Sequence, residues 1–257
     1  QARSLESDLR RACAREDFVV NYQPVVDSAS AEITGAEALL RWHCPLRGQV
    51  PPSEFIPVAE ELGLISRIGG FVLDRACADA AKWPKPIDIA VNISPIQLAD
   101  PQLVNTVKEA LQNSSLAPER LELEITETAL LGDEAAVLDA LHKIRKLGVS
   151  ISLDDFGTGY SSLSYLHRFP ISRIKIDRSF VSQLPNDEGS VSIINAIAQL
   201  GTTMNMKITA EGVETQEQSD FVAARGCNNM QGYLFSKPVQ NVDLEELLQE
   251  KYATLAA

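Results

Sequence analysis

Five short segments of the chain alternate aliphatic and polar residues. In residues 89–94 an isoleucine or valine stands at every second position, and Asn92 is one of the residues between them. The same alternation recurs in residues 121–126, 151–154, 174–177 and 208–211. Because successive side chains of a strand point to opposite faces, each segment predicts a strand with one aliphatic and one polar face.

Two longer runs near the start of the chain predict a pair of neighbouring strands. Residues 18–26 and 33–42 are both strand-like. The few residues between them cannot form a crossover helix, so we expect the two strands to be antiparallel.

The later strands alternate with helices, which indicates a parallel sheet. The predicted strands are residues 87–94, 121–127, 150–155, 173–180, 207–213 and 230–235. The predicted helices include residues 3–15, 101–112, 134–146, 190–201 and 215–225. Eight strands in about 250 residues favour one α/β domain over residues 1–257, a TIM-like (βα)8 barrel with an antiparallel first strand.

Two other folds are compatible with parts of this pattern. An open doubly wound sheet has the same alternation of strands and helices, but no G-x-G-x-x-G follows an early strand. An antiparallel sheet with one face in water has the same alternation of side chains. The helical connections count against this second alternative, because they would cover both faces.

In a barrel the aliphatic faces meet the helices, so the polar faces point inward. The inward residues near the strand ends are Asn92, Glu124, Asp154, Lys175 and Glu211. Converging carboxylates resist ionisation unless cations neutralise them, and oxygen ligands suit Mg²⁺ or Mn²⁺ better than zinc. The adjacent Asp154 and Asp155 could reach two metals, with a helix N-cap as the alternative role. Such a two-metal site would activate water against a phosphodiester.

Charge and cysteine content narrow the function. The chain has 35 acidic and 23 basic residues, a net charge of −12, which is unfavourable for binding a nucleic acid polymer. A phosphate ester would therefore need bound metals to attract it. The four cysteines form no C-x-x-C pair, which is typical of reduced thiols in a cytoplasmic protein.

No apolar run reaches the roughly 18 residues of a membrane span, so we expect no membrane contact by this fragment. The chain starts at Gln1 rather than Met. We expect a domain excised from a longer multidomain protein, with the cytoplasmic part of a membrane-attached protein as one alternative.

Short motifs along nearly the whole chain resemble the EAL domain family. The signature is Glu37-Ala38-Leu39, within residues 35–42. The supporting motifs are residues 22–24 (YQP), 55–60 (FIPVAE), 91–94 (VNIS), 123–127 (LEITE), 154–162 (DDFGTGYSS), 174–177 (IKID), 210–214 (AEGVE) and 231–235 (QGYLF). The resemblance implies a bacterial phosphodiesterase that opens cyclic di-GMP to linear pGpG, on a barrel with an antiparallel first strand and with two Mg²⁺ or Mn²⁺ ions as cofactors.

The resemblance also implies roles for single residues. The implied metal ligands are Glu37, Asn92, Glu124, Asp154, Asp155 and Glu211. The implied catalytic residues are Lys175, which would contact the attacking water, together with Glu37, Glu211 and Glu127, which would hold the 155–162 loop in place. Whether Lys175 is the base or an electrostatic support stays open.

A further set of matched positions would line the substrate groove. These positions are Gln23, Arg41, Asp177, Glu214 and Gln231, with Phe235 and Pro238 as candidate stacking surfaces for guanine. Arg41 would pair with a phosphate, for which its planar guanidinium is suited. For Phe235 a place in the core is an equally good alternative, and for Pro238 a place in a turn is.

One position departs from the family pattern, and two other functions stay open. Cys44 stands where members usually have histidine, and we expect a local packing effect near Arg41.

The two alternative functions are a degenerate domain that binds cyclic di-GMP without cutting it and a protein-interaction scaffold. The complete set of implied ligands disfavours the first, and the intact polar face disfavours the second.

The resemblance implies partners besides cyclic di-GMP. We expect a homodimer formed through elements beside the 155–162 loop. An upstream sensory or GGDEF-type domain would belong to the full-length protein.

Overall fold

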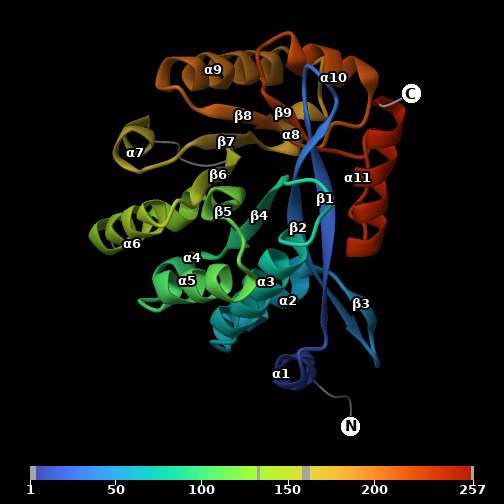
Figure 1. The fold of residues 1–257 in the computed structure, drawn as a ribbon. Coiled ribbons are helices and arrows are strands. Elements are labelled where there is room, and N and C mark those ends of the chain that lie inside the picture. The colour runs from blue at the N-terminus through green and yellow to red at the C-terminus, as the bar shows by residue number, and fades with distance from the viewer. Residues whose placement is uncertain (1–3, 132–133, 158–162, 256–257) are drawn as a thin grey trace.

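The computed structural model describes residues 4–131, 134–157 and 163–255, and eight strands of this part close into a barrel (Figure 1). Around the barrel the strands follow the order β1-β9-β8-β7-β6-β5-β4-β2, and β2 pairs with β1 to close it. The barrel strands are β1 (Phe18–Asp27), β2 (Ile33–Cys44), β4 (Asp88–Ile93), β5 (Leu121–Thr126), β6 (Ser150–Phe156), β7 (Arg173–Ile176), β8 (Lys207–Ala210) and β9 (Asn229–Met230).

Strand β1 is the one barrel strand of the described chain that runs against its neighbours. It is antiparallel to both β2 and β9, whereas the other neighbouring pairs are parallel. The predicted TIM-like (βα)8 barrel with an antiparallel first strand is therefore confirmed, and both alternative folds are wrong.

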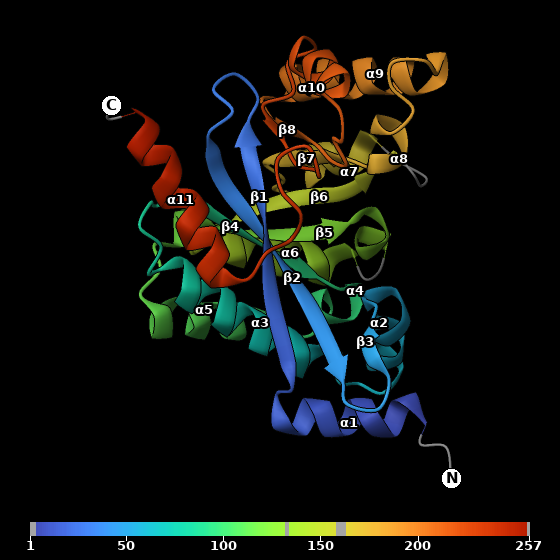
Figure 2. The ribbon, with the colours of Figure 1, turned by 90° about the vertical axis from the view of Figure 1, so that its right-hand side faces the viewer.

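Helices cover the outside of the barrel (Figures 1 and 2). They are α1 (Leu5–Arg15), α2 (Pro52–Glu61), α3 (Ile65–Ala80), α4 (Pro95–Leu98), α5 (Leu103–Ser114), α6 (Glu134–Lys146), α7 (Leu163–Arg168), α8 (Arg178–Val181), α9 (Glu188–Met204), α10 (Gln216–Ala223) and α11 (Asn241–Leu255), with the 3₁₀ helices η1 (Pro118–Arg120) and η2 (Glu127–Leu131). The aliphatic strand faces pack against them, and Ile89, Val91 and Leu121 are fully buried. Each such side chain contributes about 1.5–3 kcal/mol, which holds the helical layer on the barrel.

The β1–β2 hairpin projects past the end of its neighbour. Ala38 of β2 pairs with Val91 of β4, but β2 continues to Cys44 whereas β4 ends at Ile93. The short strand β3 (Gly48–Val50) pairs with this projecting part. Helix α1 lies at the same end, and Figure 2 shows it beneath the hairpin.

A second hydrophobic cluster fills the space between α1 and the hairpin. Trp42 and Phe55 form its centre, with their rings in an edge-to-face contact at 5.6 Å. Phe18 of β1 and Cys13 of α1 join them. Cys44 is also buried here, which places the departure from the family pattern in a packed environment close in sequence to Arg41.

Three predicted strands end earlier in the structure than the alternation indicated. Strand β7 stops at Ile176 because Asp177 caps α8, and its carboxylate accepts a hydrogen bond from the Ser179 amide at 3.0 Å. The predicted strands 173–180, 207–213 and 230–235 are therefore too long. Beyond the barrel rim these apolar segments have no neighbouring strand with which to form hydrogen bonds. Apolar residues alone therefore do not extend a strand.

Candidate functional site

Lys175 of β7 is the centre of the polar interior. Its ammonium nitrogen lies 2.7 Å from Glu124 Oε2 and 2.6 Å from Glu211 Oε1. Oxygens of Asp154 and Glu37 follow at 3.5 and 3.6 Å. The lysine side chain is 2% exposed, so four carboxylates surround one buried cation.

The Glu37 carboxylate is held by two amide groups. Asn92 Nδ2 donates to Glu37 Oε1 at 2.6 Å, and Gln231 Nε2 donates to Glu37 Oε2 at 2.6 Å. Gln231 also donates to Gln23 Oε1 at 3.1 Å, and Gln23 pairs directly with Glu37 in the β1–β2 ladder. The structure thus brings two predicted substrate residues, Gln23 and Gln231, against two predicted metal ligands.

A β-bulge turns two neighbouring aspartates toward the same side. The ladder between β6 and β7 skips one residue of β6, so Asp154 and Asp155 both turn toward Glu211. Asp155 has a φ of 55°, in the left-handed region. Oxygens of Asp154, Asp155 and Glu211 lie within 4.8 Å of one another. Both aspartates belong to a strand, so the alternative N-cap role is wrong.

The pKa values of the carboxyl groups reflect this crowding. Burial, and then the Glu37 carboxylate, raise the pKa of Glu124 well above its ordinary value. Burial raises the pKa of Glu211 to about 8, with Asp154 acting in the same direction and Lys175 against it. Burial opposes ionisation of Glu37, but Lys175 and the two amides outweigh it and lower the pKa of this group. The site therefore carries more carboxylates than one lysine can balance.

The predicted loop contact of Glu127 is present in the described part of the chain. Glu127 begins η2 directly after β5, and its Oε1 accepts a hydrogen bond from the Gly157 amide at 3.1 Å. Residues 158–162 of the 155–162 loop lie outside the described residues. Glu127 thus holds the segment that directly follows the bulge.

Arg41 lies beside a cavity of about 340 Å³ that adjoins the carboxylates through Asn92. Strand β2 and helices α2 and α3 supply aliphatic walls, among them Leu40, Ile56, Ile68 and Val72. The guanidinium of Arg41 donates to the Leu40 carbonyl at 2.9 Å, and the side chain is partly buried. Charge and apolar surface therefore meet at this edge of the site.

The other predicted groove residues lie on segments that follow the strands. Asp177 caps α8, and the Glu214 side chain is exposed after β8. Phe235 is partly buried and packs against the barrel core. Pro238 is partly buried beside Val239, whose backbone pairs with β1. Contacts of these four residues with a substrate stay predictions.

The sequence analysis did not single out Tyr233, an aromatic residue close to Phe235 in the chain. Its side chain is 57% exposed, and the Lys237 ammonium lies 5.5 Å from its ring centroid. Tyr233 is also close enough to Arg41 to affect the pKa of that guanidinium. The sequence signal for Tyr233 was its place in the motif at residues 231–235, the same motif that contains Phe235.

Comparison with known proteins identifies the family. The EAL domain model matches residues 6–238. The bifunctional diguanylate cyclase/cyclic di-GMP phosphodiesterase MucR of Pseudomonas aeruginosa is 46% identical over 236 residues, 90% of this chain and 34% of MucR. An uncharacterized signaling protein of Caulobacter vibrioides is 50% identical over 238 residues, 93% of this chain and 29% of that protein. The chain thus spans about a third of the length of these curated relatives.

Solved structures share the same fold. The MucR phosphodiesterase in complex with c-di-GMP matches with a TM-score of 0.88 and 46% identity, over 92% of this chain and 98% of that chain. The EAL enzyme Bd1971, in a form with cAMP and cyclic-di-GMP bound, matches with a TM-score of 0.91 and 36% identity, over 95% of this chain and 68% of that chain. Motifs, family model and fold agree, and the chain belongs to the EAL domain family.

Proposed function

We propose that this chain is a metal-dependent phosphodiesterase that hydrolyses cyclic di-GMP to linear pGpG. The observation that carries the proposal is the convergence of the family's carboxylates on Lys175, beside an arginine and a partly apolar cavity. The printed names of MucR and of NbdA of Pseudomonas aeruginosa, which is 40% identical over 253 residues, support the same activity.

The donor set fits divalent cations. Three carboxylate oxygens lie within 4.8 Å of one another, and four carboxylates surround the single ammonium of Lys175. Two Mg²⁺ or Mn²⁺ ions would be held by Glu37, Asn92, Glu124, Asp154, Asp155 and Glu211. Bound there, the ions would supply Lewis acidity, which lowers the pKa of water and balances the charge of a phosphodiester.

The residues of the chain have separate tasks in this reaction. A water oxygen attacks one phosphorus atom, the bond from that phosphorus to the ribose 3′ oxygen breaks, and the 3′ oxygen takes up a proton. Lys175 stays protonated among the carboxylates and would hold and polarise the water. Arg41 would pair with a phosphate oxygen, and Glu127 would keep the segment after Asp155 in place.

We also infer a homodimer and further domains in the full-length protein. Two exposed apolar residues support a dimer surface beside the 155–162 loop: Ile96 of α4 is 46% exposed and Leu131 of η2 is 59% exposed. Because α4 packs against η2, the two residues lie on adjoining elements.

The double name of MucR supports an upstream GGDEF-type domain in the full-length protein. No helix in the described ranges is long and apolar enough to cross a membrane.

The direct test is hydrolysis by the purified chain. Cyclic di-GMP is incubated with the protein and Mg²⁺, and chromatography follows the appearance of pGpG. We expect turnover with Mg²⁺ and none after EDTA treatment. Binding of cyclic di-GMP with no product would contradict the proposal and identify a sensor domain instead.

A further inference from the structure

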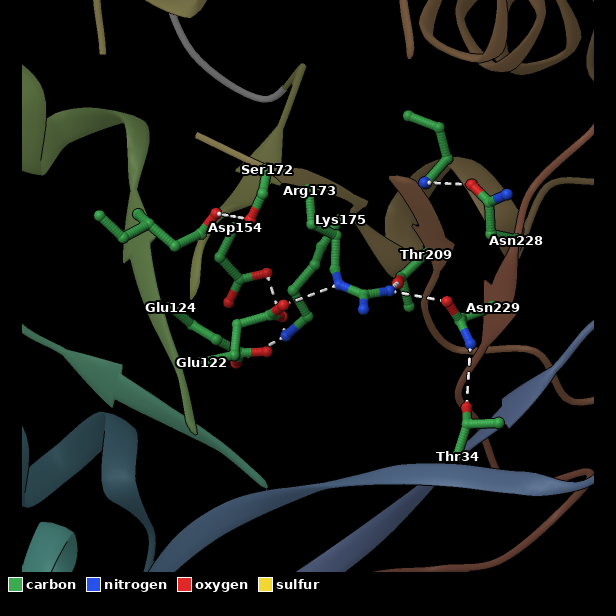
Figure 3. Close-up of polar contacts among 12 residues, drawn as sticks. Thr34, Glu122, Glu124, Asp154, Ser172, Arg173, Lys175, Thr209, Asn228 and Asn229 are labelled. Carbon is green, nitrogen blue, oxygen red and sulfur yellow. Dashed lines mark hydrogen bonds and ion pairs between the residues drawn. The ribbon is translucent and has the colours of Figure 1, made fainter. Parts of the chain in front are cut away.

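A second polar layer lies inside the barrel beneath the candidate site (Figure 3). Four residues of the site have a polar counterpart two positions earlier in the chain. The pairs are Glu122 with Glu124, Arg173 with Lys175, Thr209 with Glu211 and Asn229 with Gln231. In β5 and β7 the two members of a pair share a strand face, so both point into the barrel. Glu211 and Gln231 directly follow β8 and β9, and their contacts with Lys175 and Glu37 place them in the same interior. We call the first members, Glu122, Arg173, Thr209 and Asn229, the floor.

Arg173 joins the floor into one network. Its Nε donates to Glu122 Oε2 at 3.0 Å, and its Nη1 donates to Thr209 Oγ1 at 3.0 Å and to Asn229 Oδ1 at 2.7 Å. Asn229 Nδ2 in turn donates to Thr34 Oγ1 of β2 at 3.1 Å. One guanidinium therefore connects β7 with β5, β8 and β9, and through Asn229 with β2.

The floor and the site above it share strands β5 and β7. The side chains of Arg173 and Glu122 are each 12% exposed, and this ion pair joins the same two strands as the Lys175–Glu124 contact. Residues of both layers, among them Arg173 and Lys175, line one cavity of only about 30 Å³. A shift of the floor would therefore be passed directly to Lys175 and Glu124.

We propose that Arg173 is a positioning residue for the hydrolysis, acting through the floor on Lys175 and Glu124. The inference rests on the proposed function. Arg173 reaches no substrate, and its effect is to fix how far Lys175 stands from the carboxylates around it. A displacement of about 1 Å at a reacting centre costs on the order of 100-fold in rate.

The test compares two arginine-to-lysine substitutions. Arg173→Lys keeps a positive charge opposite Glu122 but cannot make the three hydrogen bonds of the guanidinium. Arg120→Lys is the matched control, because Arg120 uses the same kind of fork on the carbonyl oxygens of Ala80 and Ile87, outside the barrel interior. Free energy of unfolding, kcat and KM with Mg²⁺, and Mn²⁺ affinity without substrate are measured for both.

For Arg173→Lys we expect kcat to fall about 10-fold or more, with KM within about twofold of wild type and Mn²⁺ affinity lowered severalfold. For Arg120→Lys, stability falls while kcat and Mn²⁺ affinity stay within about twofold. Thr209→Val removes one acceptor of Arg173 without changing charge, and it provides the test if Arg173→Lys does not fold. For Thr209→Val we expect a smaller loss of kcat, about threefold.

Wild-type kcat and Mn²⁺ affinity in the folded Arg173 or Thr209 variant would overturn the inference and leave Arg173 a purely structural residue. Absence of turnover in the wild-type protein would contradict the proposed function instead. In that case the Mn²⁺ affinities of the variants still decide whether the floor positions the carboxylates.

Discussion

Lys175 of β7 meets Glu124 of β5 at 2.7 Å across the barrel interior, past the intervening strand β6. In (βα)8 barrels, side chains from alternate strands form one layer. Glu37 of β2 and Gln231 after β9 complete this layer, because β2, β5, β7 and β9 alternate around the barrel. The other four strands supply Gln23, Asn92, Asp154 and Glu211. The candidate site is thus built from two interlocking barrel layers in which polar residues replace the usual aliphatic ones.

Lys175→Ala should separate catalysis from binding. Turnover is expected to fall by at least about 100-fold, because a charge that stabilises the transition state is lost. Cyclic di-GMP binding should persist, since Arg41 and the metal ligands remain. Calorimetry and turnover on the same sample check both, with Lys207→Ala, an exposed lysine of β8, as the control. Loss of binding together with activity would mean that Lys175 anchors the substrate or the structure. Unchanged turnover would mean that Lys175 only neutralises the charge of neighbouring carboxylates.

Substitutions of two proposed carboxylate ligands should affect stability in opposite directions. Glu37→Ala should abolish hydrolysis and lower the free energy of unfolding by about 1–3 kcal/mol, because Asn92 loses its acceptor and Gln231 loses one of two. Glu124→Gln should also abolish hydrolysis but raise the stability of the metal-free protein, because burial and Glu37 disfavour the Glu124 charge. Chemical denaturation in EDTA measures both. Normal turnover in either variant would contradict its assignment as a ligand.

The metal-free protein should lose stability as the pH rises from about 4.5 to 8. The pKa of Glu211 is about 8 in the fold and near 4.5 when unfolded, so in this window the folded state binds more protons. The slope is at most about 1.4 kcal/mol per pH unit for such a group. The pKa of Lys175 is raised above its ordinary value and that of Glu37 is lowered, so neither titrates in the window.

Denaturation in EDTA between pH 5 and 8 would reveal this slope. Glu211→Gln should reduce the slope, because one group that takes up a proton is gone, whereas Glu124, whose pKa burial also raises, remains. Mg²⁺ should stabilise the protein more at pH 8 than at pH 5, since ligands must be deprotonated. Equal slopes for wild type and Glu211→Gln would refute the prediction.

Mg²⁺ or Mn²⁺ should support turnover, and Ca²⁺ should not. Ca²⁺ prefers longer bonds and higher coordination numbers, which do not suit a compact site of carboxylates within 4.8 Å. The measurement is the hydrolysis rate at a saturating concentration of each ion. Equal rates with Ca²⁺ and Mg²⁺ would contradict this prediction.

Substitution of the exposed apolar residues Ile96 and Leu131 should weaken the proposed dimer. Ile96→Glu and Leu131→Glu are expected to shift light-scattering masses toward the monomer, because a buried charge would oppose association. Leu46→Glu is the control, since Leu46 is 67% exposed but lies at the projecting hairpin. A fully active wild-type monomer at every concentration would contradict a role for dimerisation.

Alternation along the strands was enough to predict the barrel and the inward direction of Glu124, Asp154 and Lys175. It could not predict that Asp155 joins Asp154, because in a regular strand neighbours point to opposite faces and only the bulge turns them together. Glu37 and Gln23 came from the family motifs. For Glu37 the reason is that strand β2 is buried on both faces and shows little alternation.

The floor was also beyond sequence reasoning. Thr209 and Glu122 are polar residues within predicted strands, but Arg173, at the start of its strand, was not singled out by the sequence analysis. Its partners are Glu122, 51 positions earlier, and Asn229, 56 positions later, so the network exists only after the barrel has closed.

The reversed first strand decides where an attached domain would sit. In a fully parallel barrel the first strand begins at the end opposite the ligand-binding loops. Here β1 runs the other way, so α1 packs against the projecting hairpin, whose residues Leu40 and Arg41 line the cavity beside Asn92. Helix α11 lies at the upper left in Figure 2, away from α1. A domain attached ahead of α1 would therefore stand on the side of this cavity, and a domain attached after α11 would stand away from it.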